Sequence, residues 1–162
     1  DRTDRDTSLL FGDAAPATWL CEAGPWKFGK PLLETDGTGA HALYASEGRL
    51  PMKGREVFNF AAVEVPKQIK RCLLEKKLEP SAIDLFCLHQ GSHAIIDAIS
   101  RRFAAVSERF VVDLRDCGNT VSSTIPILLE RHVLQTSLNR VLVCGFGVGL
   151  SWATNVIEKE NR

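Results

Sequence analysis

The sequence predicts an α/β layered domain with a mixed sheet, and three observations lead to this prediction. Short apolar runs typical of buried strands alternate with stretches of helical spacing from about residue 54 onward. The 162 residues suit one domain with a real core, and 44% hydrophobic with 25% charged residues is an ordinary globular composition. Right-handed crossovers are expected between parallel strands.

The first third of the chain predicts strands and irregular structure. SLLFGD and ATWLCEA are short apolar runs around a turn signal, so residues 8–23 are expected to form a strand pair. Residues 24–52 are rich in Gly and Pro and predict either an extended loop or short irregular strands. The core of the domain is then expected over about residues 53–158 of a single domain spanning 1–162.

Helical spacing begins near Gly54, where apolar residues recur at steps of three and four. Pro66 lies inside this run and is expected to kink the helix or split it in two, because proline lacks the N–H. IDLFCL (83–88) is a buried-type strand. HAIIDAISRRF (93–103) is a helix, with Ser92 as its expected N-cap.

The same order repeats toward the C-terminus. ERFVVDL (108–114) predicts a strand, DCGNT a tight turn, and VSSTIPILLERHVL (121–134) a helix. NRVLVCGF (139–146) is another buried-type strand, and GLSWATNVI (149–157) is a closing strand.

Charge and hydropathy exclude several classes of protein. Lys plus Arg and Asp plus Glu each number 20, so a nucleic-acid binder, which usually shows a basic excess, is not expected. No apolar run approaches the ~18 residues that a membrane-spanning helix needs, and the polar start DRTDRDTS is not a signal peptide. The absent initiator Met suggests a fragment or a processed chain.

The five cysteines indicate buried thiols in a reducing cytoplasm. Their number is odd, no C-x-x-C pair occurs, and several lie in apolar runs. Cys87 and His89 are two residues apart, but no second ligand pair follows, so no metal site is predicted.

Three short segments lie at strand ends: LHQGS from Leu88, CGNT from Cys117 and GFGVGL from Gly145. Ligands of layered α/β folds gather at such places. His89 is either a satisfied, partly buried histidine or a proton-transfer or hydrogen-bonding catalytic group. Asn119 is either a turn residue or an amide donor aimed at developing negative charge.

The glycine-rich segment GFGVGL is not a dinucleotide loop. No helix follows it, and LSWATNVI continues with strand-like alternation. A strand–loop–strand turn with free backbone N–H groups can still bind an oxyanion.

Basic residues are frequent in the long predicted helix and beside it. They can form a solvated face over apolar surface, or a docking patch for an acidic carrier protein or a phosphate-bearing substrate. The set is Lys53, Arg55, Lys67, Lys70, Arg71, Lys76 and Lys77.

Five segments in order resemble the C-terminal half of the ketoacyl-acyl-carrier-protein synthase III family. They are LFGDAAPATWL, MKGREVFNFAA, LHQGS, CGNTVSSTIPILL and VLVCGFGVGLSWA, and the resemblance spans about residues 8 to 158. LHQGS keeps the His and Gln of the family's proline-His-Gln-Ala-Asn pattern. The resemblance implies the C-terminal unit of a thiolase-like αβαβα fold, with a mixed, mostly parallel sheet and an absent N-terminal half.

The resemblance also implies an activity in fatty acid biosynthesis and lipid metabolism. Family members are acyltransferases that condense an acyl-CoA with malonyl on acyl carrier protein, with loss of CO2. His89 and Asn119 match the residues that hold the malonyl carbonyl, and the backbone N–H of Val148 matches an oxyanion-hole donor. The positions that line the family's acyl and pantetheine channel match Met52, Gly54, Phe58, Gly91, Ser92 and Phe146. No cofactor is implied, since coenzyme A thioester and carrier phosphopantetheine are substrates.

The family's nucleophilic Cys belongs to the N-terminal half, so this chain alone is expected to be inactive. Ser92 replaces the motif's Asn, and Ala94 stands where a carrier-contacting Arg is common. A divergent relative in polyketide, polysaccharide or other secondary pathways is therefore one alternative. Others are acyl transfer to an alcohol or amine without decarboxylation, with His89 as general base, and a non-catalytic docking module.

The expected partners follow from the same resemblance. They are the N-terminal half of the protein, acyl carrier protein and acyl-CoA. We also expect a cytoplasmic homodimer and an apolar face where the sister half packs.

Overall fold

Five strands form one sheet in the computed structural model, which describes residues 4, 7–134 and 137–160. The strands are β1 (Trp26–Phe28), β2 (Leu32–Thr35), β3 (Leu85–Leu88), β4 (Arg140–Gly147) and β5 (Ser151–Lys159). The α-helices are α1 (Gly54–Glu75), α2 (His93–Ser100) and α3 (Thr124–His132). Short 3₁₀ helices connect them: η1 (Gly37–Ala42), η2 (Pro80–Ala82), η3 (Arg101–Arg109) and η4 (Val121–Ser123).

The sheet is mixed, as the sequence predicts, with strand order β1-β5-β4-β3 and β2 also paired to β5. β3 and β4 are parallel, whereas β5 runs antiparallel to β4, β1 and β2. The expectation of a mostly parallel sheet is therefore wrong for the described strands. β5 returns from β4 through a tight turn, which forces the antiparallel direction on that pair.

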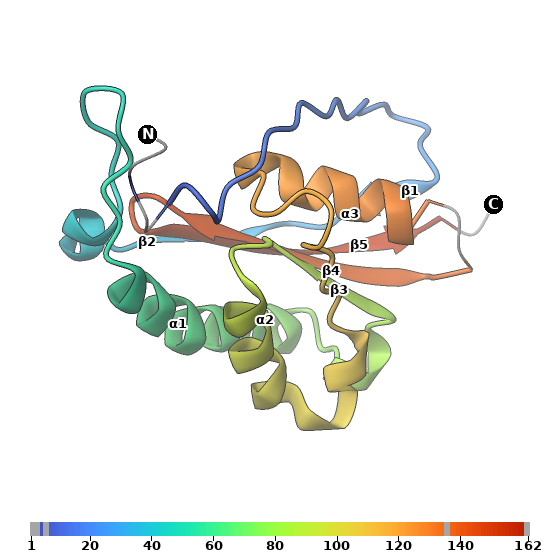
Figure 1. Cartoon of the computed structure of the whole chain (residues 1–162). Coiled ribbons are helices and arrows are strands. Elements are labelled where there is room, and N and C mark those ends of the chain that lie inside the picture. The colour runs from blue at the N-terminus through green and yellow to red at the C-terminus, as the bar shows by residue number, and fades with distance from the viewer. Residues whose placement is uncertain (1–3, 5–6, 135–136, 161–162) are drawn as a thin grey trace.

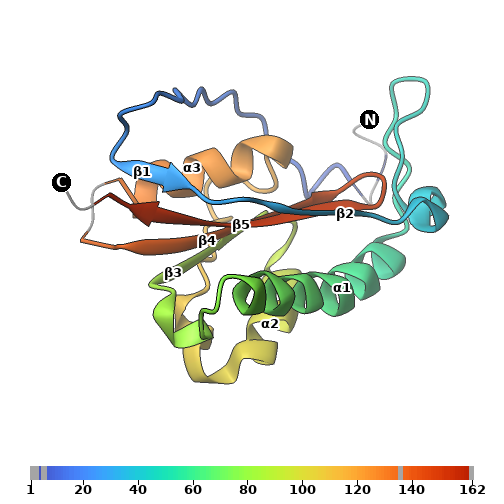
Figure 2. The same cartoon turned by 180° about the vertical axis from the view of Figure 1, so that it is seen from behind.

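The helices lie on both faces of the sheet. α1 and α2 cover one face and α3 covers the other, as the two opposite views show (Figures 1 and 2). The alternation of side chains along β3 explains this arrangement. Phe86 and Leu88 enter the core beneath α1 and α2, whereas Cys87 packs with Leu128 of α3.

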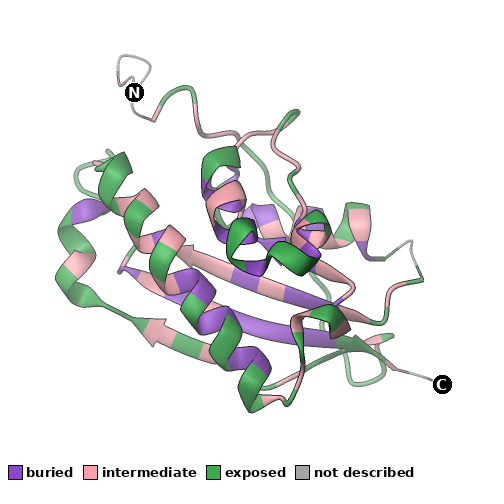
Figure 3. Ribbon diagram, turned by 90° about the horizontal axis from the view of Figure 1, so that it is seen from below, coloured by how far each residue is buried: buried purple, intermediate pink, exposed green. Residues whose placement is uncertain are grey.

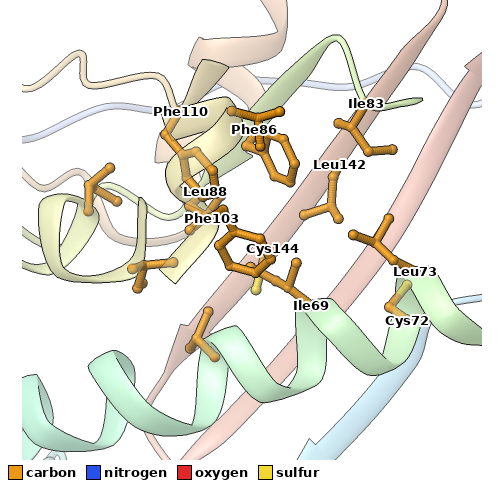
Figure 4. Close-up of a cluster of buried hydrophobic side chains, with 14 of the residues drawn as sticks. Ile69, Cys72, Leu73, Ile83, Phe86, Leu88, Phe103, Phe110, Leu142 and Cys144 are labelled. Carbon is orange, nitrogen blue, oxygen red and sulfur yellow. The ribbon is translucent and has the colours of Figure 1, made fainter. Parts of the chain in front are cut away.

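Aromatic and aliphatic side chains fill the larger core cluster (Figure 4). Phe86 stacks on Phe110 with ring centroids 4.3 Å apart, and Phe103 packs at a tilt against both. Ile69 of α1 and Leu142 of β4 are fully buried in the same cluster. Each such side chain contributes roughly 1.5–3 kcal/mol on burial, so this cluster is a main source of stability.

Helix α1 continues without interruption through Pro66, so of the two expected outcomes, a kink or a split, the split is wrong. Pro66 is itself buried, and Val65 and Ile69 beside it are fully buried against the sheet. The buried stripe along the helix is visible in Figure 3. Packing of this face compensates for the hydrogen bond that proline removes.

The strand pair expected at residues 8–23 does not form. Phe11 makes an isolated parallel bridge with Asn119, and residues 13–23 are all exposed, with Trp19 90% exposed. The apolar pattern is present, but within the described residues of this segment only Phe11 pairs with another part of the chain. Residues 24–52, by contrast, contain β1 and β2, both paired to β5.

The strand expected at 108–114 is also wrong. η3 extends to Arg109, and only Phe110 forms an isolated bridge, to Phe86 of β3. The backbone N–H of Val111 donates to the Phe86 carbonyl at 3.1 Å, after which the chain leaves the sheet edge. In the described part of the chain, no helix is both long enough and apolar enough to cross a membrane.

Candidate active site

A cavity of about 670 Å³ opens where β3 and β4 end and where α1, α2 and α3 begin. Its walls are largely apolar, as small-molecule sites usually are. All nine site residues predicted from the sequence line it. They are His89, Asn119, Val148, Met52, Gly54, Phe58, Gly91, Ser92 and Phe146.

His89 follows β3 directly. Its backbone N–H donates to the Cys144 carbonyl at 2.8 Å, so the β3–β4 ladder fixes the start of the loop. Its Nδ1 lies 2.8 Å from Thr124 Oγ1, and its ring meets Phe146 edge-on at 5.1 Å. Burial lowers the pKa of His89 to about 4, partly offset by the Val121 carbonyl, so the ring is neutral near pH 7.

Hydrogen bonds fix both the main chain and the side chain of Asn119. Its backbone N–H donates to the Leu10 carbonyl and its carbonyl accepts from Gly12 N–H, both at 2.9 Å. Its Oδ1 accepts from Val121 N–H at 2.9 Å, and Nδ2 donates to the Gly91 carbonyl at 3.4 Å. A carboxamide nitrogen carries two hydrogens, so the second is available to a ligand in the cavity.

Val148 lies in the turn between β4 and β5, and its side chain is exposed at the cavity rim. No residue in the described ranges accepts a hydrogen bond from the Val148 backbone N–H. The Val148 N–H is therefore left without a protein acceptor in these ranges, and Val148 itself lines the cavity.

The beginnings of two helices supply the remaining predicted residues. Ser92 caps α2, because its Oγ accepts from Ile95 N–H at 3.3 Å. Met52 pairs with Leu43 just before α1, which Gly54 opens, and Phe58 lies one turn further along. These helix starts direct backbone N–H groups toward the same region of the molecule.

Sequence reasoning missed several residues of the cavity wall. Thr124 contacts His89, and Leu10 and Phe11 of the N-terminal segment line the cavity next to Asn119. Thr124 lies 35 positions after His89 and occupies an ordinary helix start, so no sequence signal marks it. Trp152 also lines the wall and packs edge-on against Phe60 at 5.0 Å.

The described residues lining the cavity include no cysteine. Burial raises the pKa of Cys87 and of Cys144 to about 12, so neither is a ready thiolate. Cys87 packs under α3 with Leu128 and does not line the cavity. Among the residues that the structure describes, no group of three or more metal-ligating side chains occurs.

Several of the basic residues of α1, and Lys53 just before it, are already paired. Lys53 contacts Glu56, Lys67 contacts Glu64, and Arg71 contacts Glu34. The Lys70 ammonium lies 5.6 Å from the centre of the Phe103 ring. These contacts agree with the solvated-face interpretation for these side chains.

Comparison with known proteins places the chain in a family. The profile described as 3-Oxoacyl-[acyl-carrier-protein (ACP)] synthase III C terminal matches residues 73–159. The beta-ketoacyl-[acyl-carrier-protein] synthase III of Lactococcus lactis subsp. lactis is 32% identical, over 97% of this chain and 54% of its own length. The chain thus spans about half the length of the curated relatives it matches.

Solved structures agree in fold. The corresponding synthase III of Thermus thermophilus superposes with a TM-score of 0.84 at 34% identity, covering all of this chain and 56% of that one. A priming beta-ketosynthase from a polyketide pathway gives a TM-score of 0.83 at 28% identity, covering 99% of this chain and 53% of that one. This chain, with its thiolase-like α/β fold, belongs to the 3-oxoacyl-[acyl-carrier-protein] synthase III C-terminal family.

Proposed function

We propose that this chain is the C-terminal half of a synthase III acyltransferase that carries out a decarboxylating Claisen condensation. The observation that carries the proposal is that His89, Asn119 and Val148, far apart in sequence, line one apolar cavity. An apolar wall with a few convergent polar groups suits a thioester substrate.

The chemistry requires donors at two developing charges. The bond between the malonyl α-carbon and its carboxylate breaks, CO2 leaves, and the electron pair enters an enolate. The enolate carbon then bonds to the acyl carbonyl carbon, and a thiolate leaves. Asn119 Nδ2 and His89 would stabilise the enolate oxygen, and Val148 N–H would stabilise the tetrahedral oxyanion.

The nucleophile is assigned to an N-terminal half. The cavity wall described here carries no cysteine, and the buried Cys87 and Cys144 thiols are held protonated. We accordingly propose that the chain alone is inactive. Acyl-CoA and a carrier phosphopantetheine thioester would be the substrates, and no cofactor is needed.

The proposed assembly is a homodimer of the complete protein, in the cytoplasm. Leu33, Val121 and Val148 are apolar side chains exposed around the cavity, where a second half would cover them. All five cysteines are free, as a reducing compartment requires.

The test uses the complete protein, comprising this chain and its N-terminal half. Mass spectrometry after incubation with an acyl-CoA should show a covalent thioester, and malonyl thioester should then release CO2. His89→Ala and Asn119→Ala should each lower CO2 release by ~10²–10³-fold. The matched controls are His93→Ala and Asn59→Ala, which remove exposed side chains outside the cavity wall.

The other outcomes identify the alternatives. If the protein transfers the acyl group to an alcohol or amine and releases no CO2, the reaction is simple acyl transfer, with His89 as general base, and not condensation. A folded complete protein that forms no acyl adduct would instead be a docking module. Full activity in both cavity variants would contradict the assigned roles of His89 and Asn119.

A further inference from the structure

Three groups form a continuous hydrogen-bonded chain behind His89. His89 Nδ1 lies 2.8 Å from Thr124 Oγ1, and Thr124 Oγ1 lies 2.9 Å from the Val121 carbonyl oxygen. Thr124 is buried at the first position of α3, where little water competes for its hydroxyl.

The direction of this chain follows from the number of hydrogens. A threonine hydroxyl carries one hydrogen and a carbonyl oxygen carries none, so the hydrogen bond between Thr124 and Val121 is donated by Thr124. The contact between Thr124 and His89 can then be a hydrogen bond only if His89 Nδ1–H is the donor. A neutral imidazole has one N–H, so Nε2 carries a lone pair.

We propose that Thr124 is a positioning residue that sets the tautomer of His89. In the unliganded protein it holds the ring with hydrogen on Nδ1 and a lone pair on Nε2. The low pKa of His89 supports this assignment, since the doubly protonated ring is excluded near pH 7.

This inference rests on the proposed function, because it concerns what His89 presents to a substrate. With the lone pair on Nε2, His89 accepts a hydrogen bond from an O–H, N–H or S–H group. To donate to a thioester carbonyl instead, the Thr124 hydroxyl must turn from Val121 to His89 Nδ1, which moves the ring hydrogen to Nε2. Thr124 therefore selects between the acceptor and the donor form of one catalytic group.

Nitrogen NMR of the complete protein tests the proposal directly. With ¹⁵N-labelled histidine, the His89 signals are found by their absence from the His89→Gln spectrum. At pH 7 the unliganded protein should show a pyrrole-type Nδ1 and a pyridine-type Nε2. A pyridine-type Nδ1 in the unliganded protein would overturn the proposal, whatever the activity.

Two variants separate positioning from folding. Thr124→Val keeps the shape but removes the hydroxyl, so the ring should become a mixture of tautomers and kcat should fall ~10–100-fold. Thr124→Ser should restore the single tautomer and most of the activity. An unchanged tautomer in a folded Thr124→Val protein would refute the role of Thr124.

The NMR and activity measurements together distinguish failure of the Thr124 proposal from failure of the proposed function. The predicted tautomer in a protein without condensation activity would sustain the role of Thr124 and refute the proposed function. The opposite tautomer in an active enzyme would refute the role of Thr124 and leave the proposed function intact.

Discussion

The backbone N–H of Val121 donates to Asn119 Oδ1 at 2.9 Å, and this bond fixes which end of the carboxamide remains for a ligand. The Val121 carbonyl accepts from Thr124, which contacts His89. One peptide segment thus orients both proposed catalytic side chains. Val121 makes these bonds with φ at +54°, a left-handed conformation that is costly for a β-branched residue.

Substitution of Val121 tests this arrangement. In this chain alone, where the Val121 side chain is exposed, Val121→Gly should keep both bonds and relieve the strain, raising the free energy of unfolding by up to ~1 kcal/mol; in the complete protein it should preserve activity. Denaturant unfolding and CO2 release measure the two effects.

Two further variants accompany Val121→Gly. One measures the effect of losing an exposed valine side chain elsewhere, and the other removes the Val121 N–H. Val112 is exposed but has no positive φ, so Val112→Gly should destabilise the protein. Val121→Pro removes the donor to Asn119 and also forces φ at this position to about −65°, so it should displace the segment and abolish activity. Equal destabilisation by both glycine variants would contradict strain at Val121.

Gly12 positions Asn119 from the other side. A Cβ added at Gly12 would collide with the Cys117 backbone carbonyl, which cannot move aside. Gly12→Ala should therefore break the main-chain bonds that Leu10 and Gly12 make with Asn119. We expect a loss of CO2 release of at least ~10²-fold, comparable to loss of the donor itself.

Gly37→Ala is the matched control for that substitution. A Cβ at Gly37 meets nothing within 4 Å, and Gly37 lies outside the cavity wall. This variant should retain activity. A fully active Gly12→Ala protein would show that the N-terminal segment does not position Asn119.

The parts of the fold that the sequence predicts are those with a local signal. β3, β4 and β5 are dense apolar runs, and α2 begins at a side-chain cap on Ser92, so each was recognisable from neighbouring residues. ERFVVDL has the same apolar signal but meets β3 only at Phe110, because pairing depends on the partner edge.

In the site, too, residues with a local sequence signal were predictable and their tertiary contacts were not. His89 and Asn119 lie in short motifs at strand ends, which the sequence displays. Their partners are set by tertiary structure: Thr124 is distant in sequence from His89, and a left-handed Val121 has no residue signature, because glycine or asparagine is the usual occupant.

Stability should depend on pH through His89. Unfolding returns its pKa from about 4 to the ordinary 6.5, so between these values the unfolded chain binds the proton more readily. The contribution to stability is present above pH 6.5 and is lost as the pH falls toward 4. At pH 5 the loss should be roughly 2 kcal/mol.

Denaturant unfolding of wild-type and His89→Gln proteins at pH 7.5 and pH 5 isolates this contribution. The wild-type protein should lose more stability between the two pH values than the variant, while carboxylates such as Asp113, whose pKa is lowered by His132 and Arg131, affect both proteins alike. Equal losses in the two proteins would show that His89 titrates normally in the folded state.

Gln90 should prove essential to the loop that carries His89. Its fully buried carboxamide donates to the Leu88 and Val111 carbonyls at 2.8 and 3.2 Å and accepts from Asp113 N–H at 2.9 Å. Gln90→Leu would leave three main-chain groups without partners and should cost roughly 2–4 kcal/mol of unfolding free energy.

Gln68 offers the comparison, because it is equally buried but lies on α1, away from the loop that carries His89. Its carboxamide bonds to Thr154 and to the Trp152 carbonyl. Gln68→Leu should reduce stability by a similar amount but leave the His89 NMR signals unchanged, whereas Gln90→Leu should shift them. If Gln90→Leu lowers stability without moving the His89 signals, its role is confined to general packing.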